Sequence, residues 1–277
     1  MKKVIYLLLA VVVYSTNVLL AQVTISPTNL FIDHQSKFGT YMVINGSNEP
    51  QEISIDFIFG YSDTDNDGNR FLVYDDSAKA EQHSIKDWIR AFPRNFTLQP
   101  GQRQIVRLRV NSPNDVPDGT YWARIKTTSS PESPPVELQS TEAVTARVGF
   151  KIEQVTGVYL KKGDVSTGIE ITEMRTNRAN EGALEVLADI LRTGNSPFLG
   201  SIQLNVYDSN NRKLDIPSFI STTIFFDGTH KQEVDISSLN PGNYSVEMVF
   251  ETQRNDVSSA DLVQAPKTSK KIPFSIQ

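Results

Sequence analysis

The stretch Pro117–Lys126, PDGTYWARIK, contains a tight turn followed by a tyrosine that opens a run of alternating residues. Asn240–Phe250, NPGNYSVEMVF, repeats this order, and Tyr121 and Tyr244 are 123 residues apart. A tyrosine after such a turn resembles the tyrosine corner of immunoglobulin-like β-sandwiches, in which the hydroxyl group bonds to the backbone just upstream. One sandwich has about 100 residues, so the sequence predicts two sandwich domains in tandem.

Alternating apolar and polar residues occur on both sides of these turns, separated by clusters of Gly, Asn, Asp and Pro. This period of two is typical of antiparallel strands with one buried and one solvated face. The clearest stretches are Ile53–Phe59, Val106–Val110, Ile202–Val206 and Val246–Phe250. We expect Ser84–Arg90 to form a short helical turn and Ala183–Leu191 to form a buried strand. The predicted fold class is therefore all-β.

The first 21 residues have the layout of a secretory signal peptide. Lys2 and Lys3 precede the apolar run Val4–Val13, and the small residue Ala21 closes the segment. We expect cleavage after Ala21, export to the periplasm and no stable membrane insertion afterwards. An uncleaved membrane anchor is the alternative reading, but the apolar run is shorter than the ~20 residues that span a bilayer.

Residues 22–161 and 162–277 are the two expected sandwich domains. The boundary is placed near Lys161–Asp164, where a long alternating run gives way to polar residues and a glycine. Ser129–Ala143 is a second polar stretch with three prolines. We interpret it as a long loop within the first domain, because the apolar strand that follows needs a partner sheet.

Composition excludes several classes of protein. The chain has no cysteine, so neither disulfides nor a lipid-modified cysteine contribute, and its net charge of −5 argues against a nucleic-acid partner. His34, His83 and His230 are far apart, and no nucleophile elbow, zinc-protease motif or phosphate-binding loop occurs. We therefore expect a protein that is not an enzyme.

The segment Asp63–Asn69, DTDNDGN, places carboxylates at alternate positions before a glycine, as calcium-binding loops do. Asp63, Asp65 and Asp67 are the candidate ligands, and calcium is the only cofactor that the sequence suggests. Position twelve of such a loop is Tyr74 here instead of the bidentate glutamate of an EF-hand. An ordinary hairpin turn is the alternative interpretation.

Basic residues form a second candidate site. Arg103, Arg107 and Arg109 share one face of a predicted strand. On a nearby strand, Arg124 and Lys126 share a face with Trp122. Such residues could bind an anionic polymer or a terminal carboxylate, or they could be a solvated sheet face that discourages aggregation.

The third candidate is the segment Val144–Ile152, in which one face is entirely apolar. The residues on this face are Val144, Ala146, Val148, Phe150 and Ile152. The segment fits a core strand of a sandwich. It also fits an edge strand that lends its apolar face and its backbone hydrogen bonds to a partner polypeptide, as in β-augmentation.

Four motifs follow one another in the first half of the chain. They are Trp88-Ile89, Pro93–Gln102 with sequence PRNFTLQPGQ, Ile105–Leu108 and Pro117–Trp122. Together they resemble the first domain of the PapD-like periplasmic chaperones of fimbrial assembly, over roughly Val23–Leu160. Asp67–Phe71 fits an earlier hairpin of that family.

The resemblance implies two immunoglobulin-like domains arranged as a boomerang. Its edge strand, here Val144–Ile152, would donate apolar residues to an incomplete pilin-like subunit, with an outer-membrane usher as a further partner. Family members hold the terminal carboxylate of the subunit with basic residues. Lys151 matches one of these positions, whereas Ser26–Asn29, which matches the other, contains no Arg or Lys.

The leading hypothesis is thus a non-catalytic periplasmic chaperone-like protein that binds an exported subunit by strand donation. Two other classes stay open at this point. One is a structural or adhesive immunoglobulin-like module at the cell surface, and the other is a calcium- or glycan-binding module that uses Asp63–Asn69.

Overall fold

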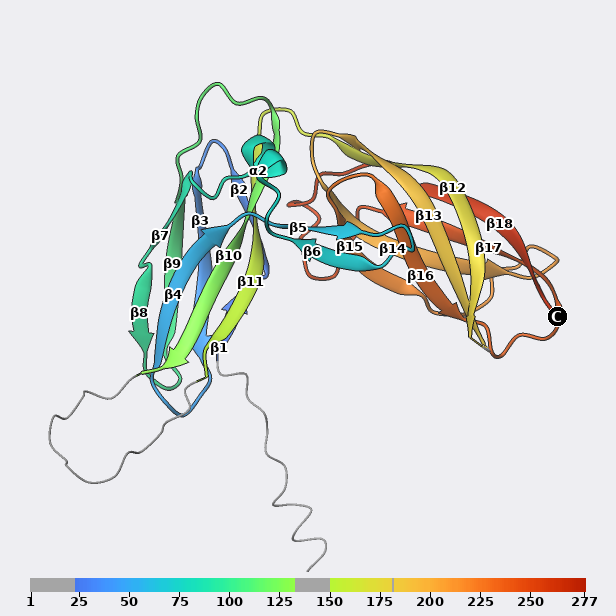
Figure 1. Ribbon diagram of the computed structural model, residues 1–277, viewed down its shortest axis with the longest axis horizontal. Coiled ribbons are helices and arrows are strands. Elements are labelled where there is room, and N and C mark those ends of the chain that lie inside the picture. The colour runs from blue at the N-terminus through green and yellow to red at the C-terminus, as the bar shows by residue number, and fades with distance from the viewer. Residues whose placement is uncertain (1–22, 133–149, 181) are drawn as a thin grey trace, which may run out of the picture.

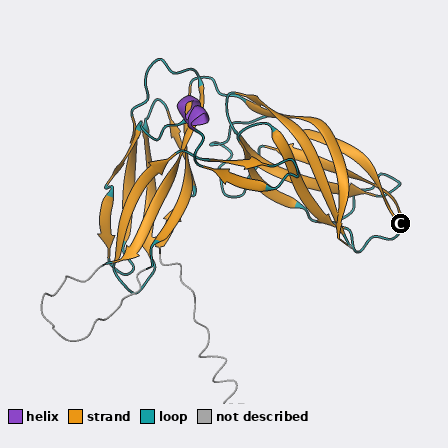
Figure 2. Cartoon of the chain, viewed as in Figure 1, coloured by secondary structure: helices purple, strands orange, loops and turns teal. Residues whose placement is uncertain are grey.

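The computed structural model describes residues 23–132, 150–180 and 182–277, and nearly all of its regular structure is β-strand (Figures 1 and 2). The strands form two sandwiches that lie at an angle to each other (Figure 1). The predicted fold class, two β-sandwich domains in tandem, is confirmed. The predicted leader, residues 1–21, lies outside the described residues.

The first domain packs a four-stranded sheet against a five-stranded one. The four-stranded sheet contains, in spatial order, β1 (Val23–Ser26), β3 (Phe38–Asn45), β9 (Arg103–Val110) and β7 (Ile89–Phe92). The five-stranded sheet contains β2 (Asn29–Asp33), β11 (Ile152–Lys162), β10 (Gly119–Pro131), β4 (Gln51–Ile58) and β8 (Asn95–Leu98). All pairs are antiparallel except β2 and β11, which run parallel.

Alternation along the strands builds the core of this domain. In β9, Val106, Leu108 and Val110 are fully buried, while the residues between them are exposed. They pack against residues of the facing sheet such as Ile55 and Ile125. The period of two in the sequence therefore corresponds to one buried face of each sheet.

The second domain packs a three-stranded sheet against a four-stranded one. The first contains β12 (Thr167–Asn180), β13 (Ala183–Gly194) and β16 (Gly228–Asp235). The second contains β15 (Phe219–Ile224), β14 (Phe198–Tyr207), β17 (Gly242–Glu251) and β18 (Thr268–Ile276). The predicted strand at Ala183–Leu191 is confirmed as part of β13.

Both predicted tyrosine corners are present. The hydroxyl group of Tyr121 donates to the carbonyl oxygen of Pro117 at 2.8 Å, and that of Tyr244 donates to the carbonyl oxygen of Asn240 at 3.0 Å. Each bond reaches back four residues across the turn before the late strand, β10 or β17. The two domains therefore share the same hydrogen-bonded turn before their late strands.

The short turn expected at Ser84–Arg90 is present, and a separate helix precedes it. Ser84–Arg90 contains a single turn, in which the Ile85 carbonyl accepts from the backbone N–H groups of Trp88 and Ile89, before β7 begins. The helix α2 (Ser77–His83) ends directly before this segment and is not among the predicted elements. Asp76 caps it by accepting from the backbone N–H of Lys79, and the extended backbone of Ser84 ends it.

The domains meet through an apolar cluster and a hairpin. The cluster joins Phe59, Tyr61, Trp122 and Tyr159 of the first domain to Leu199, Phe225 and Leu262 of the second, all buried. The hairpin, β5 (Tyr61–Thr64) and β6 (Arg70–Val73), extends from the first domain along the second (Figure 1). The Ser62 hydroxyl donates to the Thr223 carbonyl at 3.2 Å, and Arg70 donates to the Thr222 hydroxyl at 2.8 Å.

A short connection passes from one sandwich to the other. β11 ends at Lys162 and β12 begins at Thr167, with Gly163 between them at a φ of 61°. A Cβ atom on Gly163 would lie 2.0 Å from the carboxyl carbon of Asp118. The left-handed backbone favours glycine at this position, and a side chain here would displace the Asp118 carboxylate. No helix among the described residues is both long and apolar enough to cross a bilayer.

Candidate functional site

β11 has a complete neighbour on one side and a shorter neighbour on the other. β10 pairs with it over its whole length, from Ile152 to Lys162. β2 pairs with it only from Gly157 to Lys161. Within the described residues, Ile152–Thr156 therefore forms a strand edge with a partner on one side only.

The backbone N–H and C=O groups of alternate residues in this segment face the open side. The N–H of Gly157 donates to the Thr28 carbonyl at 2.9 Å, on the side that β2 occupies. Because successive residues of a strand point their backbone groups to opposite sides, Glu153 and Val155 direct theirs to the same side as Gly157. The side-chain amide of Gln154 donates to the Val23 carbonyl at 2.9 Å. The segment can accept a further strand.

Apolar side chains accompany the open edge. Phe150, Ile152 and Val155 are 68%, 36% and 41% exposed. By alternation, Ile152 lies on the side of β11 that carries the core residues Val158 and Leu160, but at the open end of the sandwich. Exposed apolar residues beside free backbone groups are the features that strand addition uses, the first for specificity and the second for affinity.

The predicted donor residues fall into two groups. Val144, Ala146 and Val148 lie outside the described residues. Phe150 directly precedes β11, and Ile152 is its first residue. Val155 was missed because it is out of phase with the alternation that selected the other residues. The sequence does contain a signal for Val155, because it is the next apolar residue after Ile152 in the same strand.

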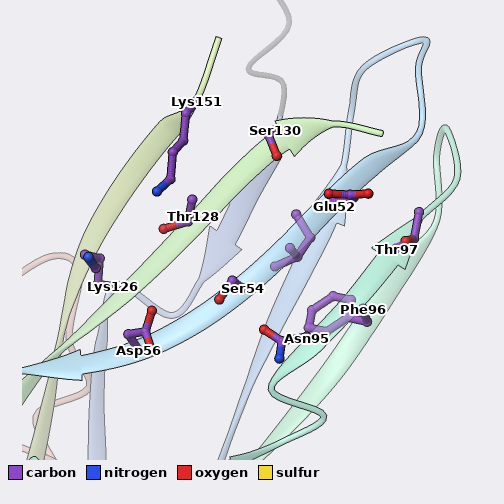
Figure 3. Close-up of a pocket in the computed structure, with 11 residues that line it drawn as sticks. Glu52, Ser54, Asp56, Asn95, Phe96, Thr97, Lys126, Thr128, Ser130 and Lys151 are labelled. Atoms are coloured by element: carbon purple, nitrogen blue, oxygen red, sulfur yellow. The ribbon is translucent and has the colours of Figure 1, made fainter. Parts of the chain in front are cut away.

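A polar groove of about 600 Å³ lies on the outer face of the same sheet (Figure 3). Alternate residues of three strands line it: Glu52, Ser54 and Asp56 from β4, Lys126, Thr128 and Ser130 from β10, and Asn95 and Thr97 from β8. Arg94 pairs with Asp56 and donates to the Ile55 carbonyl at 3.2 Å, which ties the segment before β8 to the wall of the groove. A hydrophilic, hydrogen-bonding face thus lies beside the open edge.

Lys151, the predicted carboxylate anchor, lies at the rim of this groove and points toward Thr128 (Figure 3). Its ammonium nitrogen is 3.5 Å from a Glu153 carboxylate oxygen, and the same oxygen is 3.7 Å from the ammonium nitrogen of Lys126. Glu153 therefore occupies the space between two cations. A terminal carboxylate would have to replace Glu153 there, or share the two cations with it.

The stretch without a basic residue, Ser26–Asn29, leads into β2. The side-chain amide of Asn29 donates to the Asp256 carboxylate of the second domain at 3.3 Å. Asp256 is in turn held by the guanidinium group of Arg254, whose side chain is buried. Asn29 thus contributes to the contact between the domains.

Asp63 lies in β5, and Asp65–Asn69 forms the tip of the β5–β6 hairpin. Asp65 accepts from the backbone N–H groups of Asp67 and Asn69 and from the Asn69 side chain, and these hydrogen bonds, led by that of the Asn69 side chain, lower its pKa. The Asn69 side chain also accepts from Lys231 of the second domain at 2.8 Å. No three acidic or histidine side chains come close enough to hold a metal ion in the part of the chain that the structure describes. Asp63, Asp65 and Asp67 are therefore not brought together as ligands.

The basic residues do not form one stripe. Arg103, Arg107 and Arg109 lie on the outer face of the four-stranded sheet, because they alternate with the core residues of β9. Arg124 and Lys126 lie on the outer face of the opposite sheet, in β10. Trp122 shares their side of β10 and is buried against Phe225, with ring centroids 4.8 Å apart.

No family model and no curated protein matches the chain. The solved structures to which it is similar include several chaperones. The YadV chaperone is 10% identical at a TM-score of 0.42, over 91% of this chain and 100% of that chain. The structure of Salmonella enterica SafA pilin in complex with the SafB chaperone is 10% identical at a TM-score of 0.42, over 93% of this chain and 97% of that chain. The class 5 fimbriae chaperone CfaA is 14% identical at a TM-score of 0.43, over 90% of this chain and 98% of that chain.

Proposed function

We propose that this chain is a non-catalytic, chaperone-like protein of the periplasm that binds an exported, pilin-like subunit by adding a strand of that subunit to β11. The observation that carries the proposal is the open edge at Ile152–Thr156, where backbone groups and exposed apolar side chains occur together. A bound strand would satisfy the backbone groups of Glu153 and Val155. Pockets of the partner would receive Phe150 and Ile152.

Such an edge is a liability in a protein that has no partner for it. Natural sheets protect their edges with charges, prolines or covering segments, because open apolar edges aggregate. Glu153 is the only charged residue of Ile152–Thr156. A purely structural or adhesive module would have no use for an open apolar edge, so strand binding explains it better than the alternative classes do.

The test is recovery of a bound polypeptide with the purified protein. The tagged full chain is produced in its native host, isolated from the exported fraction, and its partner is identified by mass spectrometry. In the complex, the amides of Glu153 and Val155 should exchange hydrogen more slowly than in the free protein. The double variant Phe150→Asp/Ile152→Asp should lose the partner and keep its melting temperature, because both side chains are already exposed.

Phe219→Asp is the matched control. Phe219 is 45% exposed and lies in β15 of the second domain, so this variant introduces a negative charge at an exposed aromatic residue away from β11. This variant should retain the partner. Recovery of no polypeptide with the wild type, or retention of the partner by the double variant, would contradict the proposal. Unfolding of the double variant would show that these residues serve the core.

A further inference from the structure

The outer face of the four-stranded sheet combines arginine and phenylalanine side chains from three adjacent strands. Arg90 and Phe92 come from β7, Arg107 and Arg109 from β9, and Phe38 from β3, and Arg103 lies further along β9. We call these six residues the Arg/Phe face. All six are exposed, and Phe38 and Phe92 are each 59% exposed. In Figure 1, β7 and β9 lie on the side of the first domain away from the second domain.

Strand register brings these side chains into two rows. Arg109 lies opposite Phe38 on one side and Arg90 on the other, and Arg107 lies opposite Phe92. Directly opposite residues have Cβ atoms about 5 Å apart, so each row is a continuous surface. The guanidinium carbon of Arg109 is 5.9 Å from the ring centroid of Phe38, an arrangement that holds the arginine over the ring.

In the part of the chain that the structure describes, no carboxylate pairs with the positive charge of this face. None of the strands β1, β3, β7 and β9 contains an aspartate or glutamate. Within the described residues, none of the four arginines forms an ion pair. This concentration of positive charge stands out in a chain with a net charge of −5.

The composition favours one kind of partner. The cations are all arginine and none is lysine, and arginine and aromatic residues are enriched at protein interfaces, where lysine is depleted. Guanidinium groups bind carboxylates through two parallel hydrogen bonds, a geometry that suits Asp and Glu side chains. Phe38 and Phe92 would pack against apolar or aromatic residues placed between those carboxylates.

We propose that the Arg/Phe face is a second binding surface, which takes an acidic polypeptide segment with interspersed aromatic or apolar residues. The face belongs to the sheet that does not contain β11. It is therefore available while a strand occupies the open edge, and its function does not depend on strand addition. Attraction between the exposed charges extends over about one Debye length, roughly 10 Å at 0.1 M salt, so the affinity falls as salt is added.

The test measures binding of a fluorescein-labelled peptide of about twelve residues, in which glutamate alternates with tyrosine, to the full mature chain by fluorescence anisotropy. Arg107→Gln/Arg109→Gln should weaken binding by about tenfold or more, because charge-assisted hydrogen bonds are lost. Arg212→Gln/Lys213→Gln removes the same charge from an exposed loop of the second domain and should leave the affinity within about twofold. A peptide with glutamine in place of glutamate should bind at least about tenfold more weakly.

A second pair of variants and a lipid probe complete the experiment. Arg90→Gln/Arg103→Gln should reproduce the loss, since these side chains are exposed and belong to two different strands. Vesicles containing one-third phosphatidylglycerol test the alternative that the face binds a membrane surface. Binding to vesicles without binding to the peptide would overturn the proposal. So would an absence of peptide binding, or equal losses in the Arg107/Arg109 and Arg212/Lys213 variants.

Discussion

His230 shows how one buried polar residue makes the stability of this protein depend on pH. It lies in β16, is 6% exposed, and its Nδ1 atom has no hydrogen-bond partner within the described residues. Burial, with a smaller contribution from the nearby Arg70 guanidinium group, lowers its pKa to about 4. A protonated imidazole is thus much less favourable in the folded chain than in the unfolded one.

We predict that the free energy of unfolding decreases as the pH falls from about 6.5 toward 4. In this interval the unfolded chain binds a proton at His230 and the folded chain does not, so the slope is up to about 1.4 kcal/mol per pH unit. Urea unfolding measured along this pH range should show that His230→Gln reduces the slope by that amount. His83, whose pKa is also lowered by burial, is present in both proteins and cancels in the difference. Equal slopes for the two proteins would contradict the prediction.

At the scale of secondary-structure elements, the β5–β6 hairpin connects the two domains. Its tip contains Gly68 at a φ of 73°, and a Cβ atom there would lie 2.7 Å from Cβ of Lys231 and 2.9 Å from its backbone nitrogen. The turn that resembles a calcium loop in the sequence is thus pressed against β16. Close backbone approach and a left-handed conformation both require glycine at this position.

Gly68→Ala should therefore destabilise the protein by more than backbone strain alone does. A non-glycine residue in the left-handed region costs about 1–2 kcal/mol, and the contact with Lys231 adds to this cost. Gly101→Ala is a matched control, because Gly101 has a φ of 72° and no atom within 4 Å of its Cβ position. Urea unfolding should show a larger loss for Gly68→Ala than for Gly101→Ala. Equal losses would mean that the hairpin tip does not depend on its contact with the second domain.

At the scale of the whole molecule, the apolar cluster between the sandwiches determines their arrangement. Phe225 is 2% exposed, and its ring lies 4.8 Å from that of Trp122 and 6.2 Å from that of Tyr61. The guanidinium carbon of Arg124 lies 5.4 Å from the centroid of the same ring. One side chain of the second domain is therefore enclosed by residues of the first.

Phe225→Ala should loosen this contact as well as lower stability. Removal of a buried phenylalanine costs about 3–5 kcal/mol, and here the loss falls on the interface between domains. We expect small-angle scattering to show a larger radius of gyration, and calorimetry to show two transitions in place of one. Phe198→Ala is the control, since Phe198 is fully buried in the core of the second domain. An unchanged scattering profile for Phe225→Ala, or the same change for Phe198→Ala, would contradict this account.

Much of the fold could be predicted from local pattern. Alternation identified β4, β9, β14 and β17, and the two turns before Tyr121 and Tyr244 identified the repeated sandwich, because these signals depend on neighbours along the chain. The short turn expected at Ser84–Arg90 is present, but the helix α2 before it was not predicted. Its residues are not buried, so no apolar pattern marks it, and it begins at the cap formed by Asp76.

The sites depended more strongly on tertiary structure. The alternating pattern alone places Phe150 and Ile152 on one apolar face and Arg103, Arg107 and Arg109 on another. Three features could be found only in the folded chain: β2 stops short of Val155, Arg90 and Phe38 join the arginines of β9, and a second domain covers Trp122. These features depend on strand pairing and burial, which bring together residues distant in sequence, whereas the period of two shows which side of a strand a residue faces but not what lies on that side.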